Sequence, residues 1–146
     1  MICNAKNVIF AFLTIDCIYY MTRTKESTKT ADHDLSSCII EALQDKKAQD
    51  VVEMDLSSIG VSLFDKFIIC TATSNIHADA LTENVYHKVK EKTGIMPNHI
   101  EGTTNAQWIL MDYFDTVVHI FLSDTREYYA LERLWADAAK KEYANL

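Results

Sequence analysis

The feature that most constrains the fold is a pair of apolar runs at residues 108–113 and 117–122, which a very short turn separates. If Phe114 and Asp115 form this turn, position 113 pairs with 116, 111 with 118 and 109 with 120. Residues that pair directly across antiparallel strands share one face of the sheet. One face is then wholly apolar and suits a protein core; its members are Ile109, Met111, Val118 and Ile120. A slip of one residue would scramble this assignment, so the prediction depends on this register.

The second face of this hairpin mixes aromatic, aliphatic and polar side chains. Its three cross-strand pairs are Trp108 with Phe121, Leu110 with His119, and Asp112 with Val117. No predicted helix is obviously available to cover this face, and exposed aromatic residues with polar neighbours are typical of interaction hot spots. We therefore expect a protein-docking surface here. Coverage by the first helix or by the N-terminal segment is the competing interpretation.

Hydrophobic periodicity predicts the remaining elements and an α/β fold. The predicted elements are, in chain order, a helix at 35–47, strands at 51–56 and 67–72, a helix at 76–92, strands at 108–113 and 117–122, and a helix from about 123 to 138. The run at 67–72 is continuously apolar, which indicates a central strand covered on both faces. This order predicts one small mixed sheet with helices packed against it.

Capping residues predict the helix boundaries. Asp32 or Asp34 can cap the first helix. Ser74 or Asn75 can cap the second helix, and Gly94 stands where a left-handed residue ends a helix.

The last helix is predicted to begin with a capping box formed by Asp124 and Glu127. Its expected packing face comprises Tyr128, Leu131, Leu134, Trp135 and Ala138. Tyr128 and Trp135 are therefore predicted to be core residues.

Residues 1–34 are predicted to be an extension outside a domain at 35–146. The apolar stretch between residues 8 and 21 is too short and too broken for a membrane span. The polar stretch that follows has the composition of a disordered segment. We favour the interpretation that Met21 is the working start and the first twenty residues an over-extended reading frame, rather than a membrane anchor.

The charge distribution limits the kinds of molecule that this protein is expected to bind. Acids and bases balance in residues 1–34, so the whole net charge of −7 lies in residues 35–146. Binding to a phosphate backbone normally needs a basic surface, which argues against nucleic-acid readout. An acidic domain is compatible with a basic protein partner, because opposite fields speed the encounter.

The four cysteines show no CxxC spacing, so neither a disulfide framework nor a zinc site is expected. Cys38 and Cys70 lie within apolar runs, where a reduced cysteine acts as a small hydrophobic residue. A reducing compartment is therefore expected, the cytoplasm first and an organelle interior as the alternative.

Catalytic arrangements are scarce in this chain. His119 and Asp112 could form a base with its orienting carboxylate, but no serine or cysteine carries a recognisable nucleophile motif. Asp112 and Asp115 could pair as metal ligands, although acids that flank a turn are most often solvated. No glycine pattern suits a phosphate, and the other histidines lack metal-ligand spacing. We therefore predict no catalytic residue, no metal and no cofactor.

The segment from residue 101 to 138 carries a specific pattern. Its positions are Glu101-Gly102, Trp108, Asp112-Tyr113, Asp115, Val118-His119, Phe121, Arg126-Glu127-Tyr128-Tyr129, Leu131-Glu132 and Leu134-Trp135. This pattern resembles the signature of the Iojap family, the ribosomal silencing factors. The resemblance covers roughly residues 35–138 and leaves residues 1–34 unexplained.

The resemblance implies a nucleotidyltransferase-like fold without known enzymatic activity. It also implies binding to ribosomal protein L-fourteen on the large ribosomal subunit, which blocks joining of the small subunit and represses translation when nutrients are short. The contact positions that the resemblance implies are Trp108, Asp112, Tyr113, His119 and Phe121. The hairpin register groups four of these with Leu110 and places Tyr113 on the other face or in the turn.

Three positions depart from the family pattern. Phe114 stands where a turn glycine is usual, Ala106 where a small turn residue, often glycine, precedes the tryptophan, and Lys66 where tyrosine is frequent. Two other functions stay open: a cryptic magnesium-dependent nucleotidyltransferase or hydrolase that uses Asp112, Asp115 and His119, and a scaffold that forms homodimers through the aromatic surface.

Overall fold

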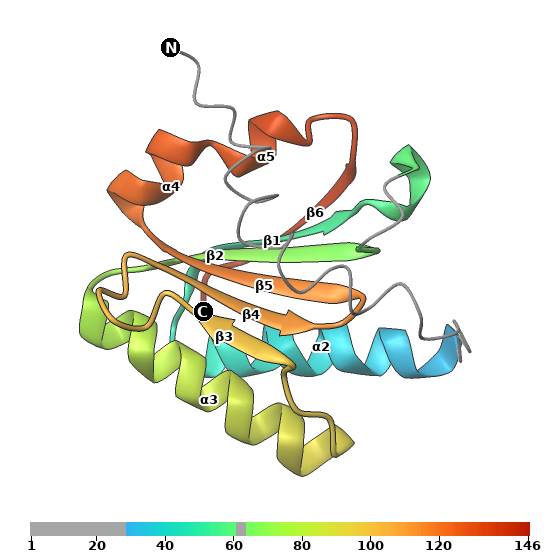
Figure 1. Cartoon of the computed structure of the whole chain (residues 1–146), viewed down its shortest axis with the longest axis horizontal. Coiled ribbons are helices and arrows are strands. Elements are labelled where there is room, and N and C mark those ends of the chain that lie inside the picture. Colours follow the sequence, from blue (N-terminus) through green and yellow to red (C-terminus); the bar gives the residue numbers. More distant parts are fainter. Residues whose placement is uncertain (1–28, 61–63) are drawn as a thin grey trace.

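The computed structural model describes residues 29–60 and 64–146 and shows one six-stranded sheet with helices on both faces (Figure 1). The elements are α2 (Lys29–Asp45), β1 (Gln49–Asp55), the 3-10 helix η1 (Ser57–Ile59), β2 (Lys66–Ala72), α3 (Asn75–Thr93), β3 (His99–Glu101), β4 (Trp108–Tyr113), β5 (Thr116–Leu122), α4 (Ser123–Tyr129), α5 (Leu131–Leu134) and β6 (Ala139–Tyr143). The predicted α/β class is confirmed.

The strand order is β3-β4-β5-β2-β1-β6, and the sheet is mixed. β2 and β5 run parallel, whereas every other neighbouring pair is antiparallel. β2 lies near the middle of the sheet, and its residues Ile68, Ile69 and Cys70 are fully buried. The central strand that the continuous apolar run predicted is therefore confirmed.

The register of the β4–β5 hairpin is the predicted one, with Tyr113 paired to Thr116 and Trp108 paired to Phe121. The turn places Phe114 in the left-handed region at φ 69°, and the Phe114 amide donates to Asp112 Oδ1 at 2.8 Å. This conformation normally favours glycine. The hydrogen bond that Phe114 donates to Asp112 helps Phe114 to occupy this conformation, so the hairpin keeps its predicted register although residue 114 is not glycine.

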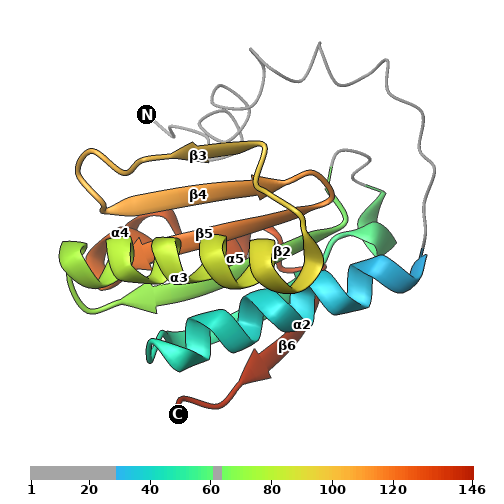
Figure 2. The ribbon, with the colours of Figure 1, turned by 90° about the horizontal axis from the view of Figure 1, so that it is seen from below.

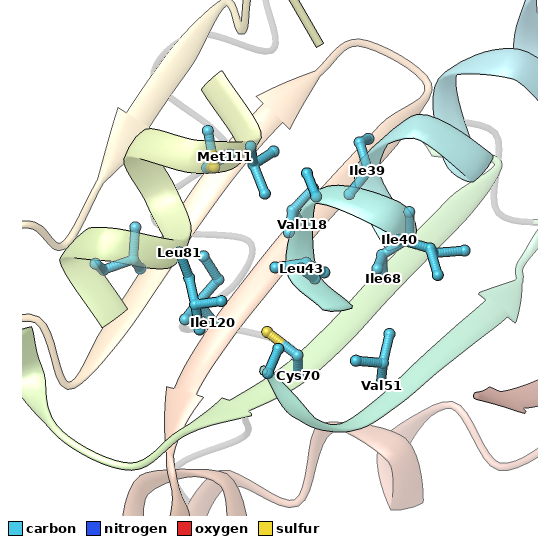
Figure 3. Close-up of a cluster of buried hydrophobic side chains, with 14 of the residues drawn as sticks. Ile39, Ile40, Leu43, Val51, Ile68, Cys70, Leu81, Met111, Val118 and Ile120 are labelled. Carbon is cyan, nitrogen blue, oxygen red and sulfur yellow. The ribbon is translucent and has the colours of Figure 1, made fainter. Parts of the chain in front are cut away.

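The predicted apolar face of the hairpin packs against α2 and α3, which together cover one side of the sheet (Figure 2). Figure 3 shows Val118 and Ile120 among side chains of both helices, including Leu43 and Leu81. These four residues are fully buried. At about 25 cal/mol per Å² of buried apolar surface, each such side chain contributes about 2 kcal/mol to folding.

The second helix, predicted at 76–92, begins and ends within one residue of these bounds. The Ser74 side chain accepts a hydrogen bond from the His77 amide, and Gly94 ends α3 at φ 74° with its amide bonded to the Lys90 carbonyl. The first helix differs, because α2 begins at Lys29. The predicted caps Asp32 and Asp34 therefore lie within the helix, and that part of the prediction is wrong.

The C-terminal region departs most from its prediction. Ala130 adopts φ 45° and divides the predicted helix into α4 and α5. The N-cap residue of α4 is Leu122 and makes no side-chain capping bond, so the capping box of Asp124 and Glu127 is not formed. Tyr128 is 81% exposed, which makes its assignment to the core wrong.

The sequence analysis also missed β6, which pairs with β1 at one edge of the sheet. Its sequence is AKKEY, and four of its five residues are exposed. Lysines on an edge strand discourage pairing with other chains, because their charge would have to be brought close to a second backbone. Lys140 and Lys141 suit β6 to this outer position.

The proposed extension and the proposed start at Met21 lie largely or wholly outside the described residues. None of the helices that the structure describes is long and apolar enough to span a membrane. Cys38 and Cys70 are buried in the core, as their apolar surroundings predicted, and within residues 29–60 and 64–146 they form no disulfide.

Candidate functional site

The face predicted to dock a partner is covered over part of its area. After β5 the chain folds back over the sheet, and α4 lies against β5 and β2 (Figure 1). His119 and Phe121 are consequently fully buried, in a second core cluster that includes Phe67 and Leu131. The expectation that these two side chains are accessible is wrong, because the C-terminal segment supplies the cover that the sequence patterns did not reveal.

The remaining predicted contact residues fall into two groups. Trp108, Leu110 and Asp112 lie on β4 and are half-buried, so each keeps part of its surface in solvent. Tyr113 is 2% exposed and belongs to the cluster on the opposite side of the sheet. A direct contact between Tyr113 and a partner would require the core to open.

His119 acts as a buried hydrogen-bond acceptor for the exposed part of the site. Trp108 Nε1 donates to His119 Nδ1 at 3.2 Å. The proton of the neutral imidazole must then lie on Nε2, which has no hydrogen-bond partner among the described residues. The bond joins β4 to β5 on this face and fixes the indole orientation.

Burial lowers the pKa of His119 to about 3. The imidazole packs edge-on against Phe67 at 4.8 Å between ring centroids, and the Phe121 ring lies parallel to it at 6.1 Å. An ion in such surroundings would lose its hydration, so the ring stays neutral near neutral pH. His119 therefore positions Trp108 and is out of reach of a dissolved substrate.

Two tyrosines of α4 extend the aromatic surface beyond β4. The Tyr129 ring lies 4.8 Å from that of Trp108, and the Tyr128 ring lies 5.1 Å from that of Tyr129. Sequence reasoning missed this role, because the continuous helix placed Tyr128 in the core. Neighbouring helix residues point about 100° apart, so two adjacent tyrosines cannot both face the core squarely. This geometry is the signal that could have identified an exposed tyrosine.

We call Trp108, Leu110, Asp112, Tyr128 and Tyr129 the docking strip, after the role predicted for this face. The register of β3 and β4 pairs His99 with Asp112 and Glu101 with Leu110, which brings both β3 side chains beside the strip. Glu101 is exposed. The strip is thus aromatic at the end near α4 and acidic along β3 and β4.

The position of Asp112 at the end of β4 changes the pKa of its carboxyl group. Burial raises its pKa above the usual value, and the hydrogen bond from the Phe114 amide opposes this rise. The side chain also holds the hairpin turn through that bond. Asp112 therefore has a structural role in addition to its place on the docking strip.

Gly102 positions the start of β4. Its φ is +84°, and a Cβ added there would lie 2.0 Å from the carbonyl oxygen of Trp108. Its carbonyl accepts from the Ala106 amide at 3.1 Å, and Ala106 is itself left-handed at φ 49°. The loop before Trp108 therefore closes tightly, and it does so without a glycine at residue 106.

The catalytic alternative needs Asp112, Asp115 and His119 to meet, and the structure does not bring them together. Asp112 pairs with Val117 across the hairpin, whereas His119 pairs with Leu110. Asp112 and His119 therefore do not lie directly opposite each other. Within residues 29–60 and 64–146 no group of three His, Cys, Asp or Glu side chains could hold a metal ion. The absence of catalysis stays a prediction.

Arg126 lines a hollow of about 400 Å³ near the carboxyl ends of β2 and β5. Its guanidinium donates to the Asp50 carbonyl and to Thr71 Oγ1, each at 2.8 Å, and pairs with Glu132. These contacts connect α4 with β1, β2 and α5. The arginine thus stabilises the segment that covers the second cluster, and Glu132 is its ion-pair partner.

The described chain is therefore a mixed α/β protein that presents an aromatic and acidic docking strip. The sequence model of the family described as ribosomal silencing factor during starvation matches residues 28–146. The chain belongs to this family, as its sequence pattern indicated.

Individual relatives agree with this assignment. Ribosomal silencing factor RsfS of Halalkalibacterium halodurans is 37% identical over 112 residues, which are 77% of this chain and 94% of that protein. The protein of the same name from Chromobacterium violaceum is 40% identical over 102 residues, 70% of this chain and 82% of that one. Protein Iojap, chloroplastic, of Arabidopsis thaliana is 29% identical over 129 residues, 86% of this chain and 53% of that protein.

Solved structures show the same fold. A crystal structure of a Chromobacterium violaceum protein has a TM-score of 0.68 and 39% identity, and the match covers 71% of this chain and 85% of that one. A crystal structure from Bacillus halodurans has a TM-score of 0.62 and 37% identity, and the match covers 70% of this chain and 94% of that one.

Proposed function

We propose that this protein represses translation in the cytoplasm. It binds ribosomal protein L-fourteen on the large ribosomal subunit, blocks joining of the small subunit, and acts when nutrients are short. Membership of the ribosomal silencing factor family supports the ribosome as the target. The observation that carries the proposal is the docking strip, where the ring of Tyr129 contacts both the half-buried Trp108 and Tyr128, which is 81% exposed.

The chemistry of the strip favours a basic protein surface. The chain has a net charge of −7, and Glu101 and Asp112 lie along the strip. Opposite charge steers the encounter and fixes the orientation of two proteins more than it adds affinity. Tryptophan and tyrosine are the residues that most often supply the affinity at an interface. The aromatic part of the strip is therefore expected to hold the partner and the acidic part to orient it.

The predicted contact residues have different roles in this proposal. Trp108, Leu110 and Asp112 contact the partner directly, and Tyr128 and Tyr129 join them. His119 and Phe121 contribute through Trp108, because one holds the indole nitrogen at 3.2 Å and the other stacks on the ring at 4.9 Å. No cofactor or bond-breaking step is required.

Co-sedimentation with purified large subunits tests the proposal. The substitution Trp108→Ala removes an indole at the centre of the strip and should weaken binding at least tenfold, as truncation of a hot-spot residue does. Ile76→Ala is a matched control, because Ile76 is 82% exposed on α3 and lies outside the strip. The control should sediment like the unmodified protein.

Thermal unfolding of both variants shows whether the fold is kept. Loss of binding in a folded Trp108→Ala protein, together with faster joining of the subunits, supports the proposal. Equal co-sedimentation of all three proteins would contradict it.

A further inference from the structure

Three aromatic rings of the docking strip form a continuous ladder at the surface. The rings of Trp108 and Tyr129 are 4.8 Å apart at 47°, and those of Tyr129 and Tyr128 are 5.1 Å apart at 87°. Tyr128 is 81% exposed, whereas Trp108 and Tyr129 are half-buried. The ladder therefore rises from the edge of the second core cluster into solvent.

The inner side of the ladder is already occupied. Phe121 stacks on the indole of Trp108 at 4.9 Å and 25°, and the indole N–H donates to the buried His119. The polar atom of Trp108 is thus used inside the protein. What Trp108 offers a partner is aromatic carbon surface, which has a negative π face.

No cation of the described chain lies over these three rings. The cation–π contacts within residues 29–60 and 64–146 place Lys90 over Tyr86 and Lys141 over Tyr143. Arg126, the cation nearest in sequence to the two tyrosines of α4, is held by Glu132. The ladder is therefore available to a cation from another molecule.

Acidic side chains accompany the ladder. Glu101 pairs with Leu110, which is two residues from Trp108 on the same face of β4, and Asp112 follows Leu110 on that face. Glu127 is exposed on the same helix as Tyr128. Together with the net charge of −7, they produce a field that attracts basic groups. Aromatic faces flanked by carboxylates are suited to a guanidinium or ammonium group.

We propose that Trp108, Tyr129 and Tyr128 receive an arginine or lysine side chain of a basic protein partner through cation–π contacts. The inference rests on the proposed docking function and names the group that the partner contributes. A cation within about 6 Å of an aromatic centroid is attracted to the ring face, and tryptophan is the strongest such acceptor. Three contiguous rings offer more than one such position.

A titration with a minimal probe tests the ladder without a ribosome. The probes are N-acetyl-arginine amide and N-acetyl-citrulline amide, which differ in charge but hardly in shape. The indole N–H signal of Trp108 and the ring signals of both tyrosines are followed by nuclear magnetic resonance. Arginine amide should shift them in a saturable manner, and citrulline amide should bind at least about fivefold more weakly.

Substitutions then separate ring chemistry from general attraction to an acidic protein. Tyr128→Leu and Tyr129→Leu should each weaken arginine amide binding about two- to fivefold, because leucine keeps apolar bulk but has no π face. Tyr128→Phe and Tyr129→Phe should bind nearly as well as the unmodified protein. Tyr86→Leu, on the opposite side of the sheet, is the matched control and should leave the titration unchanged.

The inference is overturned if arginine and citrulline amides bind equally, or if the leucine and phenylalanine variants bind alike. Sedimentation with large subunits, run in parallel, keeps the two proposals apart. Selective arginine binding without subunit binding supports the ladder and contradicts the proposed function. Subunit binding that depends on Trp108, with no arginine selectivity, supports the proposed function and contradicts the ladder.

Discussion

At the scale of single residues, His119 connects the core of the protein with its surface. Its side chain is fully buried, yet it accepts the hydrogen bond that fixes the half-exposed Trp108. The strand pattern correctly grouped these two residues on one face. It could not show the burial of His119, because the cover comes from α4 and α5, which follow later in the chain.

The protonation state of His119 should make the protein sensitive to acid. Burial lowers its pKa to about 3, whereas an unfolded histidine titrates near about 6.5. The unfolded chain therefore binds more protons between these values, so the free energy of unfolding falls as the pH falls through this window. The contribution of His119 is up to about 1.4 kcal/mol per pH unit.

Urea unfolding from pH 7 to pH 4 measures this effect. His119→Asn keeps an acceptor for the Trp108 indole but does not titrate, so its stability should depend less steeply on pH. Identical pH dependence in both proteins would show that His119 does not contribute to the acid sensitivity.

At the scale of secondary-structure elements, local patterns predicted the hairpin but not the path of the chain after it. The alternation of apolar residues in β4 and β5 sets their register. Phe114 adopts the positive φ that the turn between them requires, although it is not glycine. The break at Ala130 has no comparable signal, because alanine favours helices and rarely adopts a positive φ. The short β6 was missed because its sequence AKKEY lacks an apolar alternation.

The loop before β4 should tolerate no side chain at Gly102. Gly102→Ala would place a Cβ 2.0 Å from the Trp108 carbonyl oxygen and displace the first residue of the docking strip. Gly94→Ala is the matched control, because Gly94 has a similar φ of +74° and nothing lies within 4 Å of its added Cβ. Both variants bear the strain of a left-handed alanine, about 1 kcal/mol, and only Gly102→Ala adds a clash of about 1–3 kcal/mol.

Thermal unfolding and large-subunit co-sedimentation measure the two consequences. Gly102→Ala should melt at a lower temperature than Gly94→Ala and bind large subunits more weakly. Equal effects of the two substitutions would show that the close approach to Trp108 has no influence on the strip.

At the scale of the whole molecule, the sheet separates two core clusters with different roles. The larger cluster, under α2 and α3, contains the apolar hairpin face that the sequence predicted. The smaller cluster, under α4 and α5, supports the docking strip from within. The fold class and most elements could be predicted, because they follow from local periodicity. The division of the other hairpin face into buried and exposed parts could not be predicted, because it depends on segments that are distant in the sequence.

A homodimer formed through the docking strip would compete with ribosome binding, since both would use the same aromatic surface. The acidic character of the strip opposes such a dimer, because Glu101 and Asp112 of two copies would come close together. Light scattering at several protein concentrations distinguishes self-association from docking.

The measurement that tests the central claim most directly is site-specific photocrosslinking on purified large subunits. A photoreactive phenylalanine analogue replaces Tyr128 in one protein and Ile76 in another, since both side chains are more than 80% exposed. We predict that position 128 crosslinks to ribosomal protein L-fourteen and that position 76 does not. Crosslinks to L-fourteen from position 76 alone, or from neither position while the protein stays bound, would contradict the account.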